Sequence, residues 1–130
     1  MISAMNSGAV RFALAGFGAW GKFHAQSIAE NPDAQLVAIA APSEASREEA
    51  RRLYPDARIF ADPLEMIAQG GFDIIDIVTP SHTHFEICTA ALDAGKHVLL
   101  EKPMALSMQE CRAMVDLANK KKLTFAIGHE

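Results

Sequence analysis

Short apolar runs alternate along the chain with segments whose apolar residues recur at helical spacing. Predicted strands cover residues 10–15, 36–40, 58–60, 74–78, 97–100 and 123–127. Most of these runs are continuously apolar, which is typical of parallel strands covered on both faces. Predicted helices cover residues 20–30, 44–54 and 83–94, with a short helix from Asp62 and a last helix from Ser107. The alternation predicts an α/β fold, a doubly wound Rossmann-type parallel sheet of about six strands with helices on both faces.

Local signals mark several helix ends and indicate which helical residues face the core. Asp62 with Pro63 is a helix start, Ser107 with Glu110 is a capping box, and Gly95 is a helix stop. The helical spacing predicts that one side of the first helix buries Phe23 and Ile28. It predicts a buried stripe in the last helix formed by Cys111, Met114, Val115 and Ala118.

Composition favours one globular domain. The chain has 130 residues, of which 50% are hydrophobic and 22% charged. We expect residues 1–9 to be a loose leader and residues 10–130 to form the domain. The formal net charge is −4 and no basic stripe is visible, so nucleic acid is not an expected partner. No apolar stretch is long enough to span a bilayer, and Cys88 and Cys111 lack metal-ligand spacing. We therefore expect no membrane partner, no metal, and buried free thiols in a cytoplasmic protein.

A glycine-rich segment, Gly16-Phe17-Gly18-Ala19-Trp20-Gly21, connects the first predicted strand to the first predicted helix. A strand, a glycine turn and a helix in this order form a site for the diphosphate of a dinucleotide. Gly16 would permit the tight turn, Gly18 would let the backbone approach the pyrophosphate, and Gly21 would let the helix pack on the strand. The N–H groups at the helix start would face the anion. An isolated glycine turn without a ligand is the alternative.

The end of the second predicted strand normally supplies an acidic residue for the adenosine ribose. Here Ala41 stands at that place, and the nearest carboxylate, Glu44, begins the next helix. Ser43 and Arg47 are in position to contact a 2′-phosphate. These residues favour NADP slightly over NAD and leave NAD open.

The loop from Thr79 to His84 follows the fourth predicted strand, at the edge of the sheet where ligands bind in this fold. We expect Thr79, Pro80 and His84 to contact a ligand and both histidines, His82 and His84, to be exposed. Two histidines so placed do not make a metal site without further ligands. The alternative is a plain turn in which a hydroxyl caps the next helix.

Lys102 follows the fifth predicted strand, between Glu101 and Pro103. It would emerge at the carboxyl end of that strand, beside the nicotinamide position. An ammonium there can donate a hydrogen bond to a substrate hydroxyl or carbonyl oxygen and stabilise charge that develops on it. Glu101 is placed to pair with Lys102. A simple turn is the alternative for this segment, and His97, at the start of the strand, is expected to be structural.

Together these segments resemble the Gfo/Idh/MocA family of oxidoreductases. The resemblance runs through GFGAWGKFH, TPSHTHFEIC, AGKHVLLEKPMA and FAIGH, in the expected order and spacing. It implies an NAD(P)-dependent enzyme acting on sugars, polyols or related small molecules. It implies that Gly16, Gly18 and Gly21 hold the cofactor and that Thr79, Pro80 and His84 line it. It also implies that Glu101, Lys102 and Pro103 form the family's EKP motif, with Lys102 as the catalytic residue.

Members of that family continue into a second α/β domain, which supplies most substrate contacts and commonly the interface of a homo-oligomer. The resemblance implies that this chain holds the nucleotide-binding half alone and is inactive by itself. The alternatives are a freestanding dinucleotide-binding module or redox sensor, and a structural domain with a vestigial site.

Overall fold

The computed structural model describes residues 8–102 and 107–128, which form six strands and five α-helices in alternation. The leader residues 1–7 and Pro103 lie outside the described residues. The elements are β1 (Val10–Ala15), α1 (Ala19–Glu30), β2 (Ala34–Ala40), α2 (Glu44–Leu53), β3 (Arg58–Phe60), α3 (Pro63–Gln69), β4 (Ile74–Ile77), the 3-10 turn η1 (Ser81–Thr83), α4 (His84–Asp93), β5 (His97–Glu101), α5 (Met108–Lys121) and β6 (Phe125–Gly128).

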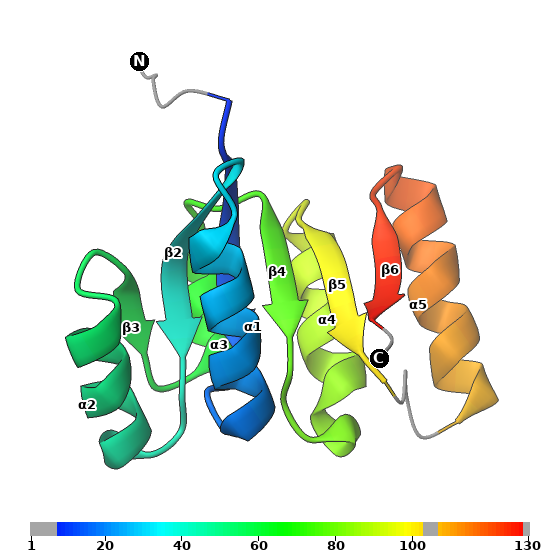
Figure 1. Ribbon diagram of the computed structural model, residues 1–130. Helices are drawn as coiled ribbons and strands as arrows, with labels where there is room; N and C mark the ends of the chain where they lie inside the picture. The colour runs from blue at the N-terminus through cyan, green and yellow to red at the C-terminus, as the bar shows by residue number, and fades with distance from the viewer. Residues whose placement is uncertain (1–7, 103–106, 129–130) are drawn as a thin grey trace.

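The six strands form one sheet in the order β3-β2-β1-β4-β5-β6, and every neighbouring pair is parallel. All strands therefore end at the same edge of the sheet, the lower edge in Figure 1. The chain moves outward from β1 in one direction through β3 and then returns to start β4 on the other side of β1. This confirms the predicted doubly wound fold and gives it a topological switch point between β1 and β4, where such folds bind ligands.

Helices cover the sheet on both faces. Figure 1 shows α1 and α2 in front of the sheet and α3 and α4 behind it, and α5 packs beside α4. Successive side chains of a strand point to opposite faces of the sheet, and a buried cluster lies on each face. Ile75 and Ile77 of β4 join the larger cluster, behind the sheet, whereas Leu14 of β1 and Ile39 of β2 join the smaller cluster with Ala25 of α1.

The predicted helix ends are confirmed by their hydrogen bonds. Asp62 Oδ1 accepts from the Leu64 N–H at 2.9 Å, and Ser107 Oγ accepts from the Glu110 N–H at 3.1 Å. Gly95 has φ +82°, and the N–H of the next residue donates to the Ala91 carbonyl, which ends α4 as a Schellman motif does. The helix ends thus follow from local chemistry.

Two expectations about helix faces are wrong. Phe23 is 57% exposed and Val115 is 41% exposed. In α1 the sheet-facing residues are Gly21, Ala25 and Ile28, because the glycine brings the helix close to β1 and turns Phe23 to the side. In α5, which lies at the β6 edge of the sheet, Cys111 is only partly buried.

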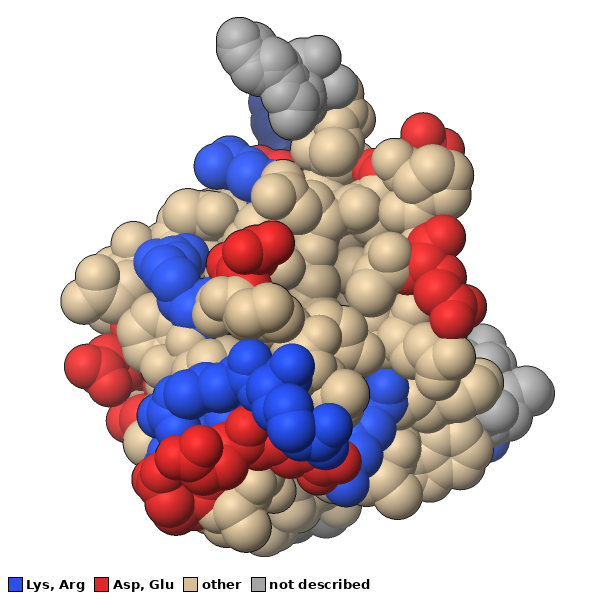
Figure 2. Space-filling view, turned by 60° about the vertical axis from the view of Figure 1, so that its left-hand side comes forward, with Lys and Arg blue, Asp and Glu red and all other residues tan. Residues whose placement is uncertain are grey.

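The outer surface of α2 is densely charged. Figure 2 shows basic and acidic side chains gathered side by side on this face of the molecule. Arg51 contacts Glu44 and Glu48 within the helix, and Lys22 of α1 reaches Glu49 at 2.8 Å. The two signs are interleaved, so this face carries no basic stripe that would suit a nucleic acid.

Candidate functional site

The glycine turn after β1 is held by close backbone contacts. Gly16 has φ +105°, its N–H donates to the Ala40 carbonyl, and a Cβ placed on it would lie 2.6 Å from the Val78 carbonyl oxygen. A Cβ placed on Gly21 would lie 2.7 Å from the carbonyl carbon of Gly16 and nearer still to its oxygen. Real Cβ atoms do not come so close, so both positions require glycine.

Gly18 differs from these two glycines. A Cβ placed on it would meet nothing within 4 Å, and its φ of −80° is open to any residue. Gly18 is the N-cap of α1, and no side chain caps the helix there. Exposed backbone with free N–H groups therefore stands at a helix start, on the ligand edge of the sheet.

The aromatic residues of the turn face in opposite directions. The side chain of Phe17 is 1% exposed and packs edge-on against Tyr54, with ring centroids 6.3 Å apart. Only the backbone of Phe17 is therefore available to a ligand. Trp20, on the first turn of α1 after Ala19, is 53% exposed and lies edge-on to Phe23. Its indole is open to solvent beside the glycine turn.

At the end of β2, an arginine stands beside the place where this fold normally has an acidic residue. Ala41 is fully buried, and its carbonyl oxygen accepts a hydrogen bond from Arg47 Nη1 at 2.8 Å. Arg47 Nη2 also pairs with Glu44 at 3.0 Å, and this hydrogen bond lowers the pKa of the Glu44 carboxyl. Ser43 caps α2 by accepting from the Ser46 N–H. The hydrogen bonds to the Ala41 carbonyl and to Glu44 fix the Arg47 guanidinium at the carboxyl end of β2.

The loop after β4 is ordered by its own side chains. Thr83 Oγ1 lies 2.6 Å from the Pro80 carbonyl oxygen and 2.7 Å from Thr79 Oγ1, so it can donate to the first and accept from the second. The expectation that His84 is exposed is wrong: it is 1% exposed, and its Nε2–H donates to the Thr79 carbonyl at 2.8 Å. His84 thus shapes the loop from below, whereas His82 lies on the surface.

A small hollow of about 170 Å³ lies among these loops. Its lining comes from the ends of β1 and β2, from the segments that follow β2, β3 and β4, and from the first turns of α3 and α4. The lining residues are Gly16, Ala40, Pro42, Ala61, Pro63, Thr79, Pro80, Thr83 and Ile87. The hollow is largely apolar and lies beside the glycine turn, at the edge of the sheet where this fold binds ligands.

At the end of β5, Glu101 turns toward α1. Glu101 Oε1 lies 3.2 Å from His24 Nε2, and His24 Nδ1 lies 2.7 Å from Asp76 Oδ2 on β4. Asp76 is 2% exposed, and burial raises the pKa of its carboxyl. Lys102 is exposed and, within the described part of the chain, forms no ion pair with Glu101. The expected pairing of Glu101 with Lys102 is replaced by a pairing with His24.

Sequence reasoning missed His24 and Asp76. Two signals were present: His24 ends the segment GFGAWGKFH, and Asp76 is a carboxylate inside the otherwise apolar run of β4. A buried carboxylate in a central strand requires a partner, and in the structure α1 supplies it with His24.

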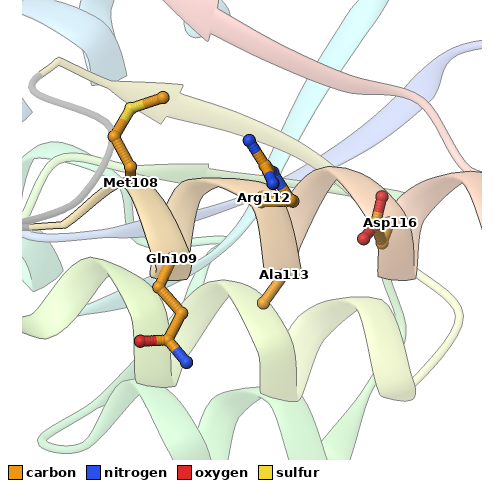
Figure 3. Close-up of a pocket in the computed structure, with 5 residues that line it drawn as sticks. All are labelled: Met108, Gln109, Arg112, Ala113 and Asp116. Atoms are coloured by element: carbon orange, nitrogen blue, oxygen red, sulfur yellow. The ribbon is translucent and has the colours of Figure 1, made fainter.

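A larger hollow, of about 460 Å³, lies elsewhere, along the outer side of α5. Figure 3 shows that its five lining side chains, from Met108 to Asp116, all come from this one helix. It is a shallow groove and contains none of the expected site residues.

Among residues 8–102 and 107–128, no cluster of three or more His, Cys, Asp or Glu side chains has a geometry suited to a metal ion. None of the helices in those ranges combines the length and the apolar character needed to cross a membrane.

Comparison with known proteins agrees with this geometry. Residues 10–129 match the model of an oxidoreductase family with an NAD-binding Rossmann fold, the Gfo/Idh/MocA family. The chain is 33% identical to UDP-N-acetylglucosamine 3-dehydrogenase of Acidithiobacillus ferrooxidans over 120 residues, which are 92% of this chain and 37% of that protein.

Two solved structures are similar throughout the described fold. Scyllo-inositol dehydrogenase from Lactobacillus casei, with bound NAD(H) and scyllo-inositol, has a TM-score of 0.88 and 30% identity over 92% of this chain and 36% of that one. Biliverdin reductase from Synechocystis, with biliverdin and NADP+, has a TM-score of 0.87 and 29% identity over 92% of this chain and 38% of that one. The chain thus spans little more than a third of these relatives. It belongs to the Gfo/Idh/MocA oxidoreductase family and comprises that family's NAD-binding Rossmann domain.

Proposed function

We propose that this chain binds a nicotinamide dinucleotide for an oxidoreductase that transfers hydride to or from a sugar, a polyol or a related small molecule. The observation that carries the proposal is the contrast among the three glycines of the turn. Gly16 and Gly21 are required by backbone contacts within the fold, whereas the space above Gly18 is open. An open glycine at an uncapped helix start leaves room for the pyrophosphate of the cofactor.

The residues around the turn fit the rest of the cofactor. The N–H groups of Ala19 and Trp20 face the diphosphate from the start of α1, and the backbone of Phe17 follows the turn. Ser43 borders the adenosine ribose, whereas the buried Ala41 acts through its carbonyl, which holds Arg47 there. The loop at Thr79 and Pro80 borders the hollow at the switch point. His84 acts through the Thr79 carbonyl that it holds, rather than by direct contact.

Lys102 is the residue that we assign to the chemical step. When bound, the cofactor supplies or accepts a hydride at C4 of its nicotinamide. Lys102 directly follows β5, the strand that neighbours β4, and its exposed side chain stands at the ligand edge of the sheet. Its ammonium can hydrogen-bond to the reacting oxygen of the substrate and stabilise the charge that grows there. Glu101 and Pro103 flank it in the sequence and complete the EKP motif.

Arg47 favours NADP over NAD. Its guanidinium is held at the end of β2 by the Ala41 carbonyl, and no acidic side chain from that strand end repels a 2′-phosphate. Glu44 already neutralises part of its charge through the 3.0 Å pair. This competition makes the preference for NADP modest, and NAD remains a usable cofactor.

The test is a titration of the protein with NADP, NADPH, NAD and NADH. Trp20 is the single tryptophan of the sequence and is exposed beside the glycine turn, so its fluorescence reports occupancy directly. We expect saturable quenching by at least one of the four, with the tightest binding for an NADP form. Absence of binding to all four at millimolar ligand would refute the proposal.

The substrate class is tested by oxidation with the bound dinucleotide. The chemistry of the relatives suggests scyllo-inositol and UDP-N-acetylglucosamine as probes, with biliverdin reduction as the contrasting class. The assay uses the protein as its gene encodes it, because the chain spans little more than a third of those relatives. Lys102→Ala is the matched variant: it should abolish turnover while the affinity for the dinucleotide changes less than about twofold.

A further inference from the structure

A largely buried polar cluster, formed by His24, Asp76 and Glu101, lies on the α1 side of the sheet at the end of β5. The histidine bridges the two carboxylates, with Nδ1 2.7 Å from Asp76 and Nε2 3.2 Å from Glu101. The exposed fractions of the three side chains are 16%, 2% and 16%. Three separate elements, α1, β4 and β5, are thereby tied together next to Lys102.

Burial of the Asp76 carboxylate costs the fold free energy. Asp76 stands between Ile75 and Ile77 in a central strand, and desolvation is the main cause that raises the pKa of its carboxyl. Its second oxygen, Oδ1, has no hydrogen-bond partner among the described residues. An apolar side chain at such a place is commonly neutral or favourable for stability. Stability of the fold therefore does not account for a carboxylate at this position.

The two contacts need two protons between them. Either a charged imidazolium of His24 donates to both carboxylates, or a neutral ring donates to one carboxylate and accepts from the other carboxyl group, which is then protonated. In both states one nitrogen of the ring is fixed by Asp76 and the other faces Glu101. Asp76 thus orients the ring, as a buried carboxylate does for a histidine in many enzyme sites.

Holding Glu101 matters for its neighbour. Glu101 is the last residue of β5, and Lys102 leaves the sheet directly after it. With Glu101 bound to His24, its carboxylate is kept on the α1 side of the sheet and away from the ammonium of Lys102. Without His24, the like charges of Asp76 and Glu101 would repel each other, which favours a Glu101 side chain turned outward.

We propose that His24 and Asp76 are positioning residues for hydride transfer: Asp76 orients His24, and His24 holds Glu101 so that Lys102 is presented unpaired to the substrate. This inference rests on the proposed function. It assigns roles to two residues outside the glycine turn, the loop after β4 and the EKP segment.

The test compares Asp76→Leu with Asp76→Asn in the protein as its gene encodes it. Leucine removes the contact with His24, whereas the amide oxygen of asparagine still accepts from His24 Nδ1. We expect Asp76→Leu to lower kcat about tenfold or more. Its affinity for the dinucleotide should stay within about twofold of wild type, and its melting temperature should be equal or higher. Asp76→Asn should restore kcat to within about threefold of wild type.

Asp73→Leu is the matched control, because Asp73 lies just before the opposite end of β4 and pairs with Arg11. It should leave kcat and affinity unchanged. The probes are scyllo-inositol and UDP-N-acetylglucosamine, whichever the wild type oxidises. If the wild type oxidises neither probe, the positioning role is tested by hydrogen exchange of the Glu101 and Lys102 amides. We expect these amides to exchange faster in Asp76→Leu than in the wild type, and at the wild-type rate in Asp76→Asn and Asp73→Leu.

The outcomes separate the two proposals. Wild-type protein that binds none of the four dinucleotides refutes the proposed function, and the positioning role falls with it. Wild-type protein that binds a dinucleotide, combined with unchanged kcat or unchanged amide exchange in Asp76→Leu, refutes the positioning role alone. A fall in kcat that tracks a fall in melting temperature also refutes it, since that pattern describes a structural residue.

Discussion

The glycine turn separates a requirement of the fold from a requirement of the ligand, and two alanine substitutions test this separation. In Gly21→Ala the new methyl group would lie 2.7 Å from the Gly16 carbonyl carbon, so helix α1 and the turn must part by about 1 Å to reach an ordinary contact. Such overpacking costs about 1–3 kcal/mol, and the better helix propensity of alanine returns up to about 1 kcal/mol. The expected loss is about 1–2 kcal/mol, or roughly 4–8 °C in melting temperature.

Gly18→Ala is the matched variant in the same turn. Its methyl group meets nothing within 4 Å, and the φ of −80° suits alanine, so we expect only about 0.5 kcal/mol of lost stability from the poorer N-cap. The methyl group would, however, occupy the space above the turn, and we expect the affinity for the dinucleotide to fall at least about tenfold.

Thermal unfolding followed by far-ultraviolet circular dichroism measures the first effect, and Trp20 fluorescence measures the second. The reasoning is refuted if Gly21→Ala has the same melting temperature as the wild type. It is equally refuted if Gly18→Ala binds the dinucleotide as tightly as the wild type does, because the phosphates would then lie elsewhere.

Three further predictions concern a charge, two thiols and an ion pair. Arg47→Ala should weaken NADP binding about tenfold or more and change NAD binding less than about twofold in the same fluorescence titration, because a charged hydrogen bond is lost only with the 2′-phosphate. Burial raises the pKa of Cys88 to about 12, so iodoacetamide should label the partly buried Cys111 in the native protein and reach Cys88 only after unfolding, as mass spectrometry would show. The Arg11 hydrogen bond lowers the pKa of the Asp73 carboxyl in the folded protein. The pair therefore stabilises the fold at pH values above the ordinary carboxyl pKa, and this stabilisation is lost as the pH falls through the folded-state pKa. Because both side chains are largely exposed, Asp73→Asn should cost only about 0.5 kcal/mol in urea unfolding at pH 7 and nothing near pH 2, and an equal loss at both pH values would contradict this.

Local signals in the sequence predicted the elements well. Four of the six strands begin where the apolar runs begin, and Asp62, Gly95 and Ser107 end or start their helices as expected. These features depend on hydrophobic period and on hydrogen bonds between residues a few positions apart, which the sequence encodes directly. The positions of Gly16 and Lys102 at the same edge of the sheet follow, since parallel strands all end at one edge.

The environment of individual side chains was harder to predict from the sequence. The exposure of Phe23 depends on how closely Gly21 lets α1 approach β1, and the burial of His84 depends on how the loop after β4 folds over the start of α4. Helical period alone marks a stripe of apolar residues but not its exact angle to the sheet. Both errors arose at positions where a close backbone contact rotates or covers the helix.

The sequence by itself thus determined the alternation of strands and helices, the glycine turn and the family. Local periodicity and turn chemistry are sufficient for these features. Only the tertiary structure brought His24, Asp76 and Glu101 together, from α1, β4 and β5. The reason is physical: the contact of a ring with two carboxylates depends on the packing angle of α1 and on the register of β4 against β5, and both are set by the whole core rather than by any short segment.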